Sequence, residues 1–138
     1  MIGVLLVTHG EIGTALLASA SQILGGAPVQ ALTLSVWRQD DPDDLVLRGR
    51  ELLEQLDAGD GVLVLTDIFG ATPGNVVSRL LDDGHVEGVS GVSLPMLLRV
   101  LTGRNASGGN KLRGAVERAL SGGAEGVVHM NSDRCLDA

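Results

Sequence analysis

Two polar residues of this sequence, His9 and Asp67, have the side chains and the neighbours needed for group-transfer chemistry. His9 follows an apolar run at residues 1–7, and Asp67 follows a second apolar run at residues 61–65. Both runs have the composition of a buried strand, so each polar residue stands where a strand ends. Ligands of open α/β sheets bind at the carboxyl ends of the strands. If the two strands are neighbours, His9 and Asp67 are predicted to meet at one edge of the sheet.

A histidine beside an aspartate is suited to nucleophilic attack. The carboxylate accepts a hydrogen bond from one imidazole nitrogen, which sets the tautomer and leaves the other nitrogen with a free lone pair. It also stabilises the positively charged ring that forms after attack. No Ser or Cys stands in a nucleophile elbow, and no second His or Cys lies at metal-ligand spacing. We therefore predict that His9 is itself the nucleophile, without a metal or cofactor.

The loops around these two residues have groups that suit the oxygens of a phosphoryl group. Gly10 allows close approach of the backbone, and Gly70 and Ala71 offer N–H groups ahead of a helix. Thr72 adds a hydroxyl, and the helix N-terminus adds a partial positive charge. Neither loop contains Lys or Arg. The predicted phosphate-binding residues are Gly10, Gly70, Ala71 and Thr72.

Each of these residues also has an interpretation that involves no chemistry. A lone His near a strand end is usually a satisfied polar residue, and an Asp before a helix is most often a turn or cap residue. Thr72-Pro73 is equally consistent with plain helix initiation. A small-ligand-binding domain without chemistry is therefore an alternative on these residues alone.

Alternating strands and helices are needed to bring the candidate residues together. Strands are expected at residues 1–7, 29–36, 61–65, 86–94 and 125–130, and helices at residues 11–24, 42–56, 73–81, 96–101 and 111–120. This alternation predicts an α/β fold with an open, mostly parallel sheet, right-handed crossovers and helices on both faces.

Length and composition favour one domain with an aliphatic core. Of the 138 residues 44% are apolar and only 1% aromatic, which suits a parallel sheet. We expect the domain at residues 1–130, a flexible tail at residues 131–138 and a glycine-rich loop at residues 103–109. The net charge of −7 offers no cationic footprint for nucleic acid. The apolar segment at the start of the sequence lacks a basic flank and is too short to insert stably in a membrane. The single cysteine, Cys135, cannot form an internal disulfide. A cytoplasmic protein is therefore expected.

Three segments of the sequence are informative together: LLVTHGEIGTALLASASQILG, LVLTDIFGATPGNVV and GVSGVSLPMLLRVL. They resemble the enzyme IIA component of the mannose family of the bacterial sugar phosphotransferase system. The match runs in order, at similar spacing, over about residues 1–130. The resemblance implies a phosphohistidine carrier in which His9 is phosphorylated, Asp67 orients it and Thr72 belongs to the phosphate-holding loop.

The resemblance also implies partners and an assembly. The family accepts a phosphoryl group from the carrier HPr and passes it to an enzyme IIB component, and its sheet has the strand order 2-1-3-4. A final antiparallel strand, here residues 126–130, is often exchanged within a homodimer. Two alternatives stay open: the phosphotransfer subunit serving dihydroxyacetone kinase, and a regulatory binding module switched by phosphorylation of His9. The resemblance leaves transport and regulatory roles open.

The remaining polar residues have plainer interpretations. Trp37 and Arg38 follow the second predicted strand, at the same edge of the sheet as His9. They are expected to be either a Trp packed on the surface and a solvated Arg, or residues that dock a partner. His85 is expected to be solvated and His129 to be structural. Arg104 is expected to be exposed, as most single arginines are.

Overall fold

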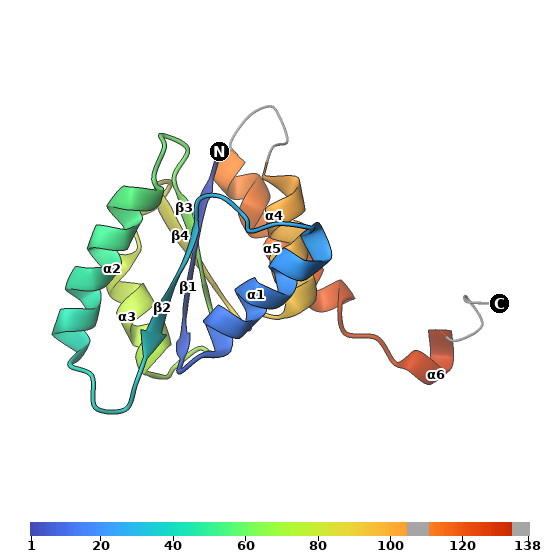
Figure 1. The fold of residues 1–138 in the computed structure, drawn as a ribbon, viewed down its shortest axis with the longest axis horizontal. Coiled ribbons are helices and arrows are strands. Elements are labelled where there is room, and N and C mark those ends of the chain that lie inside the picture. The colour runs from blue at the N-terminus through green and yellow to red at the C-terminus, as the bar shows by residue number, and fades with distance from the viewer. Residues whose placement is uncertain (105–110, 134–138) are drawn as a thin grey trace.

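Four parallel strands lie between two layers of helices in the computed structural model, which describes residues 1–104 and 111–133 (Figure 1). The strands are Gly3–His9 (β1), Ala31–Val36 (β2), Val62–Thr66 (β3) and Val86–Ser90 (β4). The helices are Ile12–Leu24 (α1), Pro42–Leu56 (α2), Thr72–Leu80 (α3), Leu94–Gly103 (α4), Lys111–Glu125 (α5) and Met130–Asp133 (α6). The predicted α/β class is confirmed.

The strand order is β2-β1-β3-β4, as the resemblance implies, and all three pairings are parallel. The central position of β1 explains its unbroken apolar run, because both of its faces are covered. In the register, His9 pairs with Val36 of β2, and Val7 pairs with Thr66 of β3. The carboxyl ends of β1, β2 and β3 therefore lie together at one edge of the sheet.

Alternate residues of the strands supply two separate cores, one on each face of the sheet. Leu6 and Leu65 pack with α1, α4 and α5, whereas Leu5 and Val64 pack with α2 and α3. Figure 1 shows these helix layers on opposite sides of the strands. The core side chains in both clusters are aliphatic, as the composition predicts.

Two helix starts follow the expected capping chemistry. Asp41 precedes α2 and accepts a hydrogen bond from the N–H of Asp43 at 2.9 Å, with Pro42 in the first turn. Ser93 caps α4 in the same way, accepting from the N–H of Met96 at 3.3 Å. The predicted strand at residues 86–94 is therefore too long, since it ends at Ser90 and the chain turns into α4.

The helix α5 is longer than the predicted range of residues 111–120. It continues through Gly122 and Gly123 to Glu125. A Cβ on Gly122 would lie 3.2 Å from the Cα of Met96 in α4. The absence of a side chain at Gly122 therefore allows α4 and α5 to pack closely, and this packing stabilises the last turns of α5.

The expected strand at residues 125–130 does not form in the single chain. Glu125 ends α5, residues 126–129 have no regular structure, and α6 starts at Met130. This segment leads away from the sheet (Figure 1), so no strand of its own chain lies beside it. Exchange in a dimer stays a prediction. The predicted tail beyond residue 133, with Cys135, and residues 105–110 of the predicted loop lie outside the described residues.

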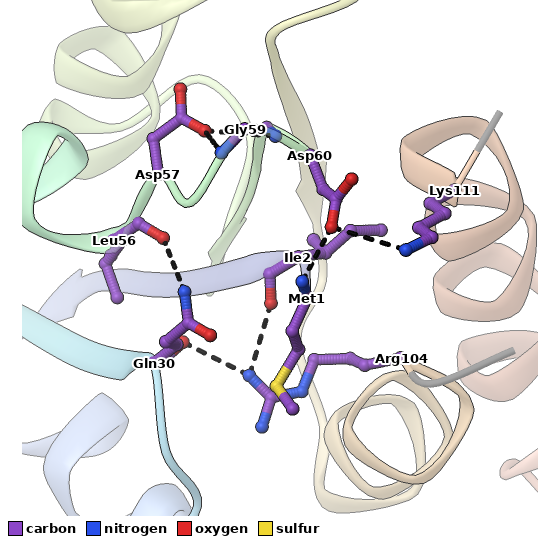
Figure 2. A network of polar contacts seen from close by, with 10 residues as sticks. Met1, Ile2, Gln30, Leu56, Asp57, Gly59, Asp60, Arg104 and Lys111 are labelled. Atoms are coloured by element: carbon purple, nitrogen blue, oxygen red, sulfur yellow. Dashed lines mark hydrogen bonds and ion pairs between the residues drawn. The ribbon is translucent and has the colours of Figure 1, made fainter. Parts of the chain in front are cut away.

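At the amino-terminal ends of the strands, a network of polar contacts links the strands to the helices (Figure 2). The guanidinium of Arg104 donates to the carbonyl oxygens of Ile2 (3.3 Å) and Gln30 (3.2 Å), which precede β1 and β2. Asp60 forms an ion pair with Lys111 of α5 at 3.4 Å. The expectation that Arg104 is exposed is wrong, because these carbonyl contacts hold its side chain in the interior, with 5% exposed.

Candidate functional site

The end of β1 presents His9 at the surface through a tight backbone turn. The N–H of Gly10 donates to the carbonyl oxygen of Val36 at 2.9 Å, and Gly10 has a φ of +50°. A non-glycine residue seldom adopts that conformation. Thr8 is buried, and its hydroxyl accepts from the N–H of Gly13 at 2.8 Å, at the start of α1. The turn therefore leaves the His9 side chain about half exposed, at 49%.

The structure brings Asp67 into direct contact with His9, as the sequence predicts. Oδ2 of Asp67 lies 2.8 Å from Nδ1 of His9 and accepts the backbone N–H of His9 at 3.0 Å. Oδ1 of Asp67 accepts the backbone N–H of Ile68 at 3.0 Å. Backbone donors thus hold both carboxylate oxygens, and the side chain is only 13% exposed. The position and orientation of the carboxylate are set by the backbone.

The contact also sets the tautomer of His9. A carboxylate only accepts hydrogen bonds, so Nδ1 carries the proton and Nε2 carries the lone pair. Burial raises the pKa of Asp67, but the hydrogen bonds from the ring and backbone of His9 lower it further, so the net shift is below the ordinary value of 3.8. Asp67 is therefore ionised at neutral pH, and Nε2 is the ring nitrogen of His9 that keeps a free lone pair.

A cavity of about 460 Å³ lies beside His9, and Thr72 is the predicted phosphate-binding residue that lines it. Thr72 begins α3, and the residue before it, Ala71, makes no side-chain cap. Gly70 and Ala71 form the turn into α3 without lining the cavity, and Gly70 has a φ of +88°. A Cβ on Gly10 would lie 3.3 Å from the Trp37 ring. Of the four predicted phosphate-binding residues, the structure thus places Thr72 on the lining of the cavity, whereas Gly10 and Gly70 form backbone turns.

The other residues that line this cavity come from the end of β2 and the start of α2: Val36, Trp37, Arg38, Asp40 and Pro42. The sequence placed Trp37 and Arg38 at the same edge as His9 but did not assign them to its site, and it did not single out Val36, Asp40 or Pro42. The parallel pairing of β1 with β2 was the signal that could have found them, because it places the residues after each strand side by side.

A metal centre and a membrane-spanning helix are both absent from the described part of the chain. Residues 1–104 and 111–133 contain no group of three or more His, Cys, Asp or Glu side chains that could hold a metal ion. None of the helices described there has the length and apolar character needed to cross a membrane.

The comparisons with known proteins agree with this geometry. The family model described as the PTS system fructose IIA component, EIIA-man, matches residues 3–117. The chain belongs to this family. EIIA components are phosphotransferases that carry phosphoryl groups in sugar phosphotransferase systems.

Individual relatives of the EIIA family support the same assignment. The mannose-specific EIIAB component of Escherichia coli K12 is 31% identical over 105 residues, which cover 75% of this chain and 32% of that protein. The chain therefore spans about a third of that relative. The fructose-specific EIIA component of Bacillus subtilis 168 is 30% identical over 103 residues, or 74% and 70% of the two chains.

A solved structure shows the same EIIA fold. The phosphotransferase system component EIIA from Streptococcus agalactiae superposes with a TM-score of 0.83, covering 96% of this chain and 99% of that one, at 24% sequence identity. This likeness concerns the fold, and the role of each residue rests on the geometry above.

Proposed function

We propose that this chain is a cytoplasmic phosphoryl carrier in which Nε2 of His9 accepts a phosphoryl group from HPr and passes it to an enzyme IIB component. The observation that carries the proposal is the 2.8 Å contact between Nδ1 of His9 and a carboxylate whose oxygens are held by backbone N–H groups. This contact supplies a nucleophile of defined tautomer without a metal.

The transfer is a displacement at phosphorus. The lone pair of Nε2 forms a bond to phosphorus while the bond from phosphorus to the donor nitrogen breaks, and that electron pair stays on the donor. The ring keeps its proton on Nδ1 and becomes positively charged, which strengthens its hydrogen bond to Asp67. The second transfer reverses these steps, because the neutral ring leaves when the acceptor attacks.

The test is reconstitution from phosphoenolpyruvate, enzyme I and HPr with labelled phosphate. The proposal predicts one label on the chain that is lost in acid and stable in alkali, and then transfer to an enzyme IIB protein. Absence of label on the wild-type chain contradicts the carrier role. A labelled chain that passes phosphate to no IIB protein supports the regulatory alternative, and transfer to a dihydroxyacetone kinase supports the other alternative.

Exposed apolar side chains near His9 support a protein as the phosphoryl donor. Ile68 and Phe69 follow Asp67 directly and are 55% and 80% exposed, and Trp37 and Ile12 are each 46% exposed. Such side chains are enriched where proteins dock. A small phosphate donor has no use for this surface, whereas a carrier protein would bury it.

Replacing Ile68 with serine is expected to weaken docking and to spare the chemistry. The side chain is exposed and only its backbone N–H bonds Asp67, so the variant keeps the site geometry. We expect KM for HPr to rise about fivefold to tenfold, with kcat nearly unchanged. Leu47→Ser, on the exposed side of α2, is the matched control. Equal KM values for both variants would remove Ile68 from the docking surface.

We also propose that the chain forms a homodimer through residues 126–130. Apolar side chains in this segment are exposed in the single chain: Val127 by 85%, Val128 by 51% and Met130 by 77%. In the part of the chain that the structure describes, no strand pairs with the outer side of β4, and an apolar groove of about 390 Å³ runs there between α3 and α5. The segment from a second copy, paired with β4, would cover both surfaces.

Val127→Asp is expected to convert a wild-type dimer into a monomer. A charge in a buried, exchanged strand has no partner there, so the assembly loses stability. Light scattering coupled to size-exclusion chromatography measures the change, and Leu47→Asp is the matched control. A monomeric wild-type chain, or a Val127→Asp variant that stays dimeric, would argue against the exchanged strand.

A further inference from the structure

The cavity beside His9 contains one arginine, and neither the family resemblance nor the proposed mechanism uses it. Among the described residues that line this cavity, Arg38 is the only Lys or Arg. Thr72 lines the same cavity from the start of α3, while Arg38 comes from the end of β2. The two side chains therefore border the space around His9 from two different elements.

A closed turn presents Arg38 to this cavity. The N–H of Asp40 donates to the carbonyl oxygen of Trp37 at 3.0 Å, and Oδ2 of Asp40 accepts the N–H of Trp37 at 2.8 Å. Arg38 occupies the second position of this turn. The turn follows Val36, whose carbonyl accepts the N–H of Gly10. The turn that carries Arg38 thus starts directly after a residue bonded to Gly10, the neighbour of His9.

The guanidinium of Arg38 is available to bind an anion. It makes no hydrogen bond and no ion pair with any residue in the described ranges 1–104 and 111–133, and its side chain is exposed. The nearest carboxylate in sequence, Asp40, is engaged by the backbone N–H of Trp37. Arginine offers five N–H donors in a planar fork that matches phosphate oxygens.

The negative charges around His9 make a cation favourable there when His9 carries a phosphoryl group. A phosphoryl group on Nε2 brings a charge of about −2. Asp67 contacts the ring, Asp40 lines the cavity, and the whole chain has a net charge of −7. Without a positive side chain, the added phosphate would face these carboxylates with only backbone amides and the hydroxyl of Thr72 to bind it.

We infer that Arg38 binds the phosphoryl group carried by His9, pairing with its oxygens from the β2 side while Thr72 bonds them from the α3 side. This inference rests on the proposed function and adds a specific residue to it. In the transfer step, the new bond joins Nε2 to phosphorus, the donor nitrogen leaves with its electron pair, and Arg38 neutralises the oxygens throughout without exchanging a proton.

A protein-free donor separates this role from docking. Phosphoramidate carries its phosphoryl group on nitrogen, so attack by Nε2 breaks the P–N bond and releases ammonia, which takes its proton from water. No partner surface takes part in this reaction. An arginine that only docks an acidic partner has no effect on it, whereas one that binds the phosphoryl group does.

The test compares wild type, Arg38→Ala, Arg38→Lys and Arg48→Ala with phosphoramidate as the only donor. Arg48 is exposed on α2, does not line the cavity and controls for lost charge. We expect Arg38→Ala to phosphorylate His9 about tenfold more slowly and to lose its phosphate several-fold faster. Arg38→Lys is expected to recover part of both rates, and Arg48→Ala to match wild type.

The outcomes distinguish the inference from the proposed function. Equal rates for Arg38→Ala and wild type with phosphoramidate overturn the inference, even if Arg38→Ala is slow with HPr. A wild-type chain that no donor labels on His9 overturns the proposed function itself. Addition of 0.5 M NaCl should narrow the gap between wild type and Arg38→Ala, since salt screens an exposed guanidinium–phosphate pair.

Discussion

A His9→Ala variant is expected to take up no phosphate from HPr, because the proposed mechanism forms the bond to phosphorus at Nε2 of this residue. The reduction should be complete within the detection limit of labelling. No neighbouring nucleophile replaces it, since Asp67 has both oxygens held by N–H groups and Thr72 has no basic group bonded to it in the described residues.

The fold of the His9→Ala variant is expected to be retained. The lost side chain is about half exposed, and the backbone N–H at this position still donates to Asp67. We expect the free energy of unfolding to change by about 1 kcal/mol or less, as measured by urea denaturation. A loss of labelling in this variant therefore reports the missing imidazole.

The two other histidines of the chain are matched controls for His9→Ala. His85 uses only its backbone in the turn before β4, and Nδ1 of His129 lies 2.8 Å from the hydroxyl of Ser132. Neither is part of the cavity beside His9. His85→Ala and His129→Ala should be labelled like the wild-type chain. Label that persists in His9→Ala, or disappears in either control, would contradict the assignment.

The sequence was sufficient to predict the strands, their ends and the residues that meet there, because these follow from the pattern of apolar runs. Buried apolar runs end in polar residues, and the order of strands brings the ends of β1 and β3 together, so the pairing of His9 with Asp67 was foreseeable. The orientation of the carboxylate was not, because it depends on which backbone N–H groups reach each oxygen. That detail arises from the register of β1 with β3 and from the turn after Asp67.

The failures of sequence reasoning have a common physical cause, which is long-range packing. Arg104 is buried because carbonyls of residues 2 and 30 lie within reach of its guanidinium, far away in sequence. Gly122 lies within α5 because α4 packs against it. The segment at residues 126–130 has the composition of a short strand, but a strand needs a partner, and the described residues of the single chain offer none beside it.

Asp67→Asn is expected to slow phosphorylation of His9 by about 100-fold or more, because it sets the wrong tautomer. The carboxylate accepts hydrogen bonds from the N–H of Ile68, the N–H of His9 and the ring of His9, and its Oδ1 also accepts from the hydroxyl of Thr66 at 3.5 Å. An asparagine side chain has one oxygen and one NH₂ group. If its oxygen stays on Ile68, the NH₂ group faces His9, and Nδ1 must become the acceptor. The proton then moves to Nε2 and removes the attacking lone pair.

The kinetics of Asp67→Asn should show this loss in kcat, with KM for HPr nearly unchanged, since the docking side chains are untouched. Asp41→Asn is the matched control, because it removes one carboxylate charge while asparagine caps α2 equally well. A transfer rate in Asp67→Asn equal to that of Asp41→Asn would exclude Asp67 from the mechanism.

The stability of the same variant has a defined pH dependence. The pKa of Asp67 is lower in the folded chain than its ordinary value of 3.8, so the ionised carboxylate stabilises the fold above that pH. The contribution is complete at neutral pH and is lost as the pH falls through the lowered pKa. Wild type should therefore be more stable than Asp67→Asn at pH 7, and the difference should shrink below about pH 4. The difference in urea midpoint between wild type and Asp67→Asn could instead be the same at pH 7 and pH 3. The charge of the carboxylate would then not stabilise the loop, and the tautomer argument would lack its electrostatic basis.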